Sequence, residues 1–136
     1  MSFEKYLNSA KGYFHGLQVL TSNLQQNTVD PIGLLASQSI ELSLKAYLLY
    51  VGWNEKQLKK IGHDLVEAWT NARKNDLPIS KEPAFSIQLL SLSHDAPYLF
   101  RYPKGKAVTA IPSPDQLCRE IGNLIYIVEN EIAKKC

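Results

Sequence analysis

Apolar residues recur at steps of three and four along most of this chain, which is the spacing of one helix face. In the first segment this face carries Tyr6, Ala10, Tyr13, Leu17, Leu20 and Leu24. After a polar run, Asp30 followed by Pro31 is typical of a helix start, because a capping side chain then precedes a residue without a backbone N–H. A second helix is therefore expected from about Pro31 to Val51, ended by Gly52.

Two shorter helices are expected in the middle of the chain. The first covers "HDLVEAWTNARKNDLP", where apolar residues again follow helical spacing. The second covers "KEPAFSIQLLSLSHDAP", in which Phe85, Leu89 and Leu92 would form the apolar face before Pro97.

A long helix is expected at the end of the chain, with Ser113 or Asp115 as its cap around Pro114. Its apolar face would consist of Leu117, Ile121, Leu124, Val128 and Ile132. The pattern as a whole predicts an all-α fold, a four- to five-helix up-and-down antiparallel bundle that forms one domain over residues 1–136.

Composition narrows the class of protein. Hydrophobic residues make up 45% and charged residues 21% of the 136 residues, and no apolar stretch approaches the roughly 20 residues that span a bilayer. The N-terminal segment has charges early and lacks the pattern of a signal peptide. A cytoplasmic protein without a membrane segment is expected.

Charge and cysteine content suggest neither a general nucleic-acid binder nor a metalloprotein. The net charge of +2 is small, and Lys56, Lys59 and Lys60 are interpreted as solvated, with a local basic cluster as the alternative. Cys118 and Cys136, if on one helix, would be about 27 Å apart and too distant for a disulfide. No zinc-ligand spacing occurs, so we expect no metal and no cofactor.

The stretch "SQSIELSLKAYLLYVG" is the most apolar part of the chain, yet it contains Glu41 and Lys45. A helix that is apolar nearly all round is expected to be central. Ser39, Ser43 and Tyr50 form a second polar stripe on its other side. We expect that both stripes cannot face a deep core, so at least one would be exposed.

If Glu41 is buried, its carboxylate needs a partner, because an uncompensated charge in a dry site costs several kcal/mol. Lys45 is the nearest candidate by its spacing of four residues. Other partners would come from "GHDL" at residues 62–65 or from "FRYP" at residues 100–103, where the helical pattern breaks.

The order of these motifs, "SQSIELSLKAYLLYVG", then "IGHDLVEAWTNARKNDL" and later "FRYP", resembles the HEPN superfamily of small helical domains from prokaryotic defence, toxin and nucleotide-associated systems. The resemblance implies a four- or five-helix bundle, frequent homodimerisation and a connection to RNA or nucleotides. It also implies a protein partner such as a nucleotidyltransferase-type antitoxin.

Ribonucleases of this superfamily carry an arginine followed four to six residues later by a histidine. No histidine lies in that window after Arg73, Arg101 or Arg119. The arginine would stabilise phosphate charge and the histidine would transfer protons, so neither role is filled at the matching position. The resemblance therefore favours a noncatalytic member, and no catalytic residue is assigned.

Six residues are candidates for a ligand site: Glu41, Lys45, His63, Asp64, Arg101 and Tyr102. His63 is expected either to pack at the start of a helix, with Asp64 in the first turn, or to reach Glu41 across a helix interface. Arg101 would bind a carboxylate or phosphate, or else pin its loop beside Tyr102.

The other histidines, His15 and His94, are expected at the surface. The predicted function is a noncatalytic HEPN-like binding or interaction module, with RNA or a nucleotide as ligand, in a defence or toxin–antitoxin setting. Two alternatives are a divergent metal-independent ribonuclease using Arg101 and His63, and a structural homodimeric partner protein without a ligand site.

Overall fold

The computed structural model describes residues 2–24, 29–94 and 112–134. These residues form α-helices and no β-strand, which confirms the predicted all-α class for this part of the chain. The helices are α1 (Phe3–Thr21), α2 (Val29–Tyr50), α3 (Glu55–Ile61), α4 (Leu65–Lys74), α5 (Phe85–His94) and α6 (Pro114–Ala133).

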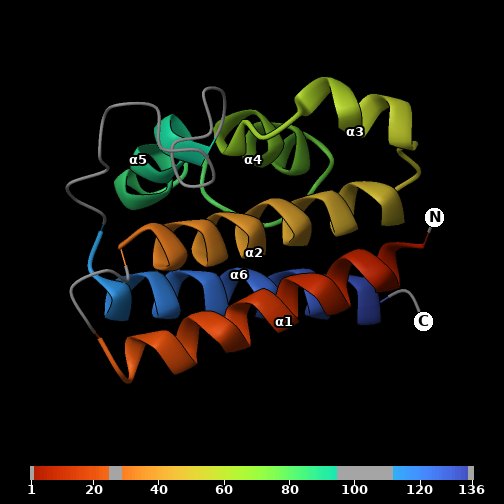
Figure 1. Cartoon of the computed structure of the whole chain (residues 1–136). Helices are drawn as coiled ribbons and strands as arrows, with labels where there is room; N and C mark the ends of the chain where they lie inside the picture. The colour runs from red at the N-terminus through yellow and green to blue at the C-terminus, as the bar shows by residue number, and fades with distance from the viewer. Residues whose placement is uncertain (1, 25–28, 95–111, 135–136) are drawn as a thin grey trace.

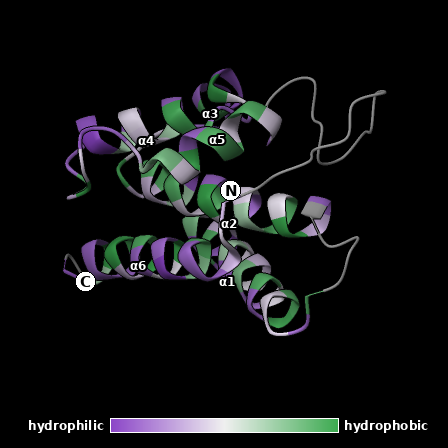
Figure 2. Cartoon of the chain, turned by 90° about the vertical axis from the view of Figure 1, so that its left-hand side faces the viewer, coloured by the Kyte–Doolittle hydropathy of each residue, from purple (hydrophilic) through white to green (hydrophobic). Residues whose placement is uncertain are grey.

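Helix α2 is the centre of the fold. It packs against α1 and α6 on one side and against α4 and α5 on the other, and α1 also contacts α6 (Figures 1 and 2). Figure 2 shows α2 between the layer of the two long helices and the layer of shorter ones. A helix enclosed from both sides must be apolar nearly all round, as the sequence of α2 is.

The direction of the long helices departs from strictly antiparallel packing. In Figure 1, α1 runs opposite to α2, but α6 runs in the same direction as α2. The physical reason is the path of the chain, because α3, α4 and α5 follow one another back along α2 to the end where α2 begins. The next long helix, α6, starts at that same end (Figure 1).

Both polar stripes of α2 are buried, apart from the partly exposed Tyr50, contrary to the expectation that one would be exposed. Glu41 and Lys45 are 5% and 7% exposed, and Ser39 and Ser43 are fully buried. The two serine hydroxyls donate to carbonyls of their own helix one turn back, at 2.8 Å to Leu35 and 2.7 Å to Ser39. A serine that is satisfied in this way needs no water, so this side can face the other long helices.

Helix α3 was not predicted, because its sequence reads as a polar spacer. Asn54 and Gln57 form a capping box in which each side chain accepts from the other's backbone N–H, both at 2.9 Å. Only Leu58 and Ile61 are buried. Two apolar residues are too few to show helical periodicity.

Helix α5 occurs where it was expected, but its predicted face is wrong. Phe85, Leu89 and Leu92 are 72%, 41% and 73% exposed. The buried residues of this helix are Ser86, Ile87, Leu90, Ser91 and His94. The serines and the histidine are buried because each has a polar partner on another element, which sequence periodicity does not show.

The prediction for the last helix is confirmed in detail. Ser113 caps α6, Pro114 follows at its first position, and the apolar face from Leu117 to Ile132 is buried. In α1 the expected face is buried at Ala10 and Leu17, but Tyr13 between them is 38% exposed, and Leu24, beyond the end of α1, is 57% exposed. None of the helices within the described residues combines the length and the apolar character that crossing a membrane requires.

Candidate functional site

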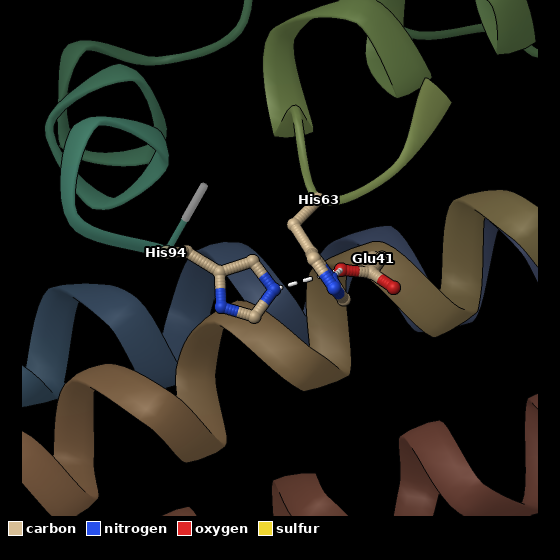
Figure 3. A group of neighbouring side chains, drawn as sticks. All are labelled: Glu41, His63 and His94. Carbon is tan, nitrogen blue, oxygen red and sulfur yellow. Dashed lines mark hydrogen bonds and ion pairs between the residues drawn. The ribbon is translucent and has the colours of Figure 1, made fainter. Parts of the chain in front are cut away.

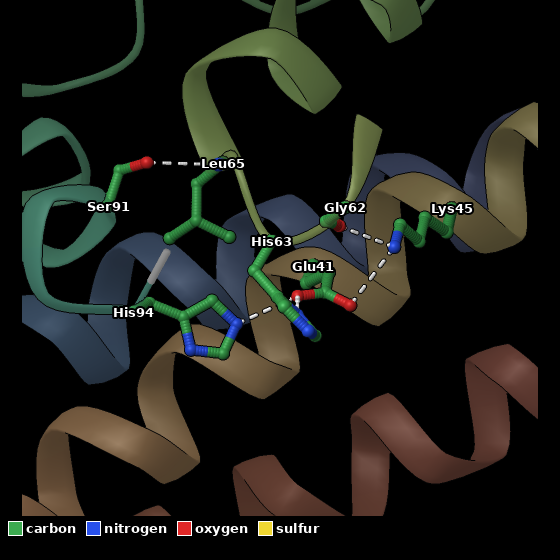
Figure 4. A network of polar contacts seen from close by, with 7 residues as sticks. All are labelled: Glu41, Lys45, Gly62, His63, Leu65, Ser91 and His94. Atoms are coloured by element: carbon green, nitrogen blue, oxygen red, sulfur yellow. Dashed lines mark hydrogen bonds and ion pairs between the residues drawn. The ribbon is translucent and has the colours of Figure 1, made fainter. Parts of the chain in front are cut away.

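The carboxylate of Glu41, midway along α2, accepts hydrogen bonds from three side chains (Figure 4). Nδ1 of His63 lies 2.8 Å and Nε2 of His94 2.7 Å from the same oxygen, Oε1. Nζ of Lys45 lies 3.1 Å from Oε2. We call Glu41, Lys45, His63 and His94 the Glu41 cluster; it joins α2, the junction between α3 and α4, and the end of α5.

The junction between α3 and α4 positions His63. Gly62 ends α3 at φ 61° and ψ −128°, a conformation that is essentially restricted to glycine. Asp64 then caps α4 by accepting from the N–H of Glu67 at 3.0 Å. Lys45 holds the junction from below, since its Nζ donates to the carbonyl of Gly62 at 2.6 Å. The imidazole of His63 consequently points down onto α2 (Figure 4).

His94 approaches Glu41 from the other direction, at the last position of α5. Its side chain is fully buried, so the expectation of a surface position is wrong, whereas His15 is exposed as expected. The His63 and His94 rings meet edge to face, with centroids 5.2 Å apart. One turn before His94, Ser91 accepts from the N–H of Leu65 at 3.0 Å, which ties α5 to the start of α4.

Glu41 is held in its charged form. Burial favours the neutral acid, but the hydrogen bond from His94, the positive charge of Lys45 and the hydrogen bond from His63 outweigh it and lower the pKa of Glu41 to about 2. The carboxylate is therefore ionised at neutral pH. Both histidines then donate N–H groups to Oε1, which sets the tautomer of His94 as Nε2–H when that ring is neutral.

The cluster is closed on most sides but reaches solvent at one residue. The side chain of His63 is 28% exposed, whereas those of Lys45, Glu41 and His94 are 9%, 6% and 0% exposed. Oε1 of Glu41 and one ring nitrogen from each histidine all lie within 4.8 Å of one another (Figure 3). Two imidazoles and a carboxylate in this arrangement can share protons or bind a cation.

The structure thus brings together three of the six predicted site residues, Glu41, Lys45 and His63. Asp64 caps its own helix and is not part of the Glu41 cluster. Arg101 and Tyr102 lie outside the described residues.

His94 was missed as a member of the cluster. A signal was present, because His94 shares a helix face with Ile87 and Leu90 at spacings of seven and four. The more apolar alternative face of the same helix concealed that signal.

A separate surface hollow lies between α3 and α4 and has a volume of about 260 Å³. It is lined by Trp53, Gln57, Lys60, Ile61, Glu67 and Asn71, and we call it the α3–α4 hollow. Lys56 and Lys59 are also exposed on α3. An aromatic ring, a cation, a carboxylate and two side-chain amides therefore meet at one surface position.

Comparisons with known proteins do not extend this picture. No protein-family model matches the chain, and searches of curated proteins and of solved structures find no significant match.

Proposed function

We propose that this chain is a noncatalytic helical module that binds RNA or a nucleotide at the α3–α4 hollow. The observation that supports the proposal is the lining of the hollow, where Trp53 and Lys60 lie beside the amides of Gln57 and Asn71. Single-stranded RNA and nucleotides are typically recognised by stacking of a base on an aromatic ring, by cations near phosphate and by amides at base edges.

The charges around the hollow favour an anionic ligand. Lys56, Lys59 and Lys60 are all exposed on the short helix α3, against two acidic residues, Glu55 on the same helix and Glu67 in the lining of the hollow. A local patch of this kind supplies phosphate contacts even though the net charge of the chain is only +2. The lysines that composition alone assigns to solvent thus become candidate phosphate ligands.

The biological setting is proposed from the sequence resemblance. The order of "IELSLKAYL", "GHDL" and "FRYP" supports a HEPN-like domain with an up-and-down bundle topology and a role in defence or toxin–antitoxin systems. A nucleotidyltransferase-type antitoxin is the corresponding protein partner.

Binding of a fluorescent single-stranded RNA, followed by anisotropy across a salt titration, tests this function. We expect affinity to fall steeply with salt, and Trp53→Ala and Lys60→Ala each to weaken binding roughly 5- to 100-fold, as loss of a stacked base or a phosphate contact would. Lys5→Ala is the matched control, because Lys5 is exposed on α1 in the other layer. No binding near physiological salt, or a flat salt dependence, would favour the partner-protein alternative.

The same samples also test whether the protein is a ribonuclease instead. In that alternative the candidate base is His63, which is partly exposed and hydrogen-bonded to a carboxylate. RNA that stays intact through a long incubation without metal supports the noncatalytic proposal. Cleavage by the wild type that disappears in His63→Ala would refute the noncatalytic proposal and support the ribonuclease alternative.

The proposed assembly is a homodimer through the long helices. Val19 on α1 and Tyr126 on α6 are large apolar side chains that are 53% and 66% exposed, and a dimer interface on these helices would cover them. Light scattering should give twice the chain mass at micromolar concentrations, and Tyr126→Glu should shift it towards the monomer. A wild-type monomer throughout that range would refute the dimer.

A further inference from the structure

Three metal-ligating atoms converge inside the Glu41 cluster. Glu41, His63 and His94 come from three different elements, and one ligand atom from each lies within 4.8 Å of the other two (Figure 3). His63 and His94 are 22 and 53 positions from Glu41 in the chain, so no short ligand motif announces them. The sequence expectation of no metal rested on the absence of such a motif.

We propose that Glu41, His63 and His94 form a binding site for a divalent transition-metal ion such as Zn²⁺. Two imidazoles and one carboxylate are a donor set for Zn²⁺, Co²⁺, Ni²⁺ or Fe²⁺, whereas Mg²⁺ and Ca²⁺ prefer oxygen ligands.

Without an ion, the space between the three ligand atoms is occupied by the hydrogen atoms of hydrogen bonds. The two N–H groups that point at Oε1 of Glu41 occupy the space between the three donors. When an ion binds, each of these nitrogens must give up its proton, to the other nitrogen of its ring or to solvent, and present a lone pair instead. The carboxylate is already ionised and brings one negative charge to the dication.

The two nitrogen–oxygen distances are close to those that an ion requires, and the ligand atoms of the three residues lie within 4.8 Å of one another. Ligands about 2.0–2.1 Å from a tetrahedral Zn²⁺ are about 3.3 Å apart. The nitrogens of His63 and His94 lie 2.8 and 2.7 Å from Oε1, so each must move outwards by about half an ångström. His63 lies on the junction between two helices and is 28% exposed, which gives it room to move and gives the ion a path in.

Among the residues that the structure describes, Lys45 is the lysine or arginine that binds the same carboxylate. Its Nζ donates to Oε2, the oxygen that does not accept from the histidines. The same Nζ also donates to the carbonyl of Gly62 at 2.6 Å. Lys45 therefore orients the carboxylate so that Oε1 stays directed at the imidazoles. A protein ligand held by a further hydrogen bond of this kind is typical of metal sites.

The test is a titration of the chelator-treated full chain with Co²⁺, whose visible absorption reports its ligands. We expect one Co²⁺ per chain and displacement of its spectrum by Zn²⁺. His63→Ala should weaken binding at least 10-fold, while His15→Ala, which removes an exposed histidine on α1, should leave it unchanged. No binding at millimolar Co²⁺, or equal binding by wild type and His63→Ala, would overturn the proposal.

Two further measurements make the result independent of folding and of thiols. Zn²⁺ should raise the melting temperature of the wild type and of His15→Ala but not of His63→Ala, whose circular dichroism shows whether it is folded. A thiolate charge-transfer band in the Co²⁺ spectrum would assign the ion to a cysteine and refute the site. The Glu41 cluster shares no residue with the α3–α4 hollow. The tests of metal binding and of RNA binding are therefore independent of each other.

Discussion

Nε2 of His94 lies 2.7 Å from Oε1 of Glu41, although the two residues are 53 positions apart and on different helices. Both side chains are almost fully buried. The contact therefore ties the end of α5 to the middle of α2 through a charge that has little access to water. Removing either partner leaves a polar group buried, which costs more than the hydrogen bond itself contributes.

Replacing Glu41 by glutamine should destabilise the fold strongly. The Glu41→Gln side chain keeps the size but not the charge, so the buried Lys45 ammonium loses its counter-ion, and we expect a loss of about 3–5 kcal/mol in unfolding free energy. The matched control is Glu129→Gln, which breaks the exposed pair with Lys11 and should cost less than about 1 kcal/mol. Urea denaturation measures both; similar losses in the two variants would contradict a buried cluster.

Stability should fall in acid in a defined pH window. The pKa of Glu41 is lowered from 4.5 to about 2 in the folded chain, so the unfolded state binds the proton more tightly. The stabilisation from this group is then complete above pH 4.5 and lost as the pH falls towards 2, a change on the order of 3 kcal/mol. Urea titrations of chelator-treated protein across this range check it. Glu41→Gln should lack this component, and an equal acid sensitivity in that variant would show that other groups cause it.

Gly62→Ala should destabilise the junction that carries His63. The added Cβ would meet nothing closer than 3.9 Å, so the penalty comes from φ 61° rather than from a clash, and we expect about 1–3 kcal/mol. Gly12→Ala on α1 is the control, because its Cβ has open space and helical geometry and should stabilise by up to about 1 kcal/mol. Thermal melts of the two variants should therefore shift in opposite directions. An unchanged melt for Gly62→Ala would mean that the junction does not need glycine.

Substitutions on α5 should show which of its faces is buried. Leu90 is 1% exposed, and Leu90→Ala should cost about 2–5 kcal/mol because it leaves a cavity. Leu92 is 73% exposed, and Leu92→Ala should change stability by no more than about 0.5 kcal/mol. Chemical denaturation of the two variants measures both effects. A larger loss for Leu92→Ala than for Leu90→Ala would mean that the face predicted from periodicity is the buried one.

Local patterns were sufficient for the elements whose signals are local. The cap at Ser113 with Pro114, the apolar face of α6 and the central character of α2 all follow from spacing and capping within one helix. Two residues of the expected α1 face, Ala10 and Leu17, are also buried. Such features depend on neighbours three or four residues away, which the order of residues shows directly.

The candidate site was accessible from the sequence only in part. Burial of Glu41 raised the need for partners, and Lys45 and "GHDL" were identified as their source. The sequence left open whether His63 packs at a helix start or contacts Glu41. The position of the α3–α4 junction over α2 decides this. That position depends on the glycine turn at residue 62 and on the packing of α4, neither of which spacing reports.

Long-range polar contacts account for what the residue pattern missed. Ser86, Ser91 and His94 look like the solvent side of α5, and they are inside because Glu120, the N–H of Leu65 and Glu41 satisfy them. A polar group is buried wherever a partner on another element meets its hydrogen-bonding needs. The order of amino acids therefore specifies the helices and most of the core, while the packing of α5 against α2 and α4 creates the two-histidine, one-carboxylate cluster.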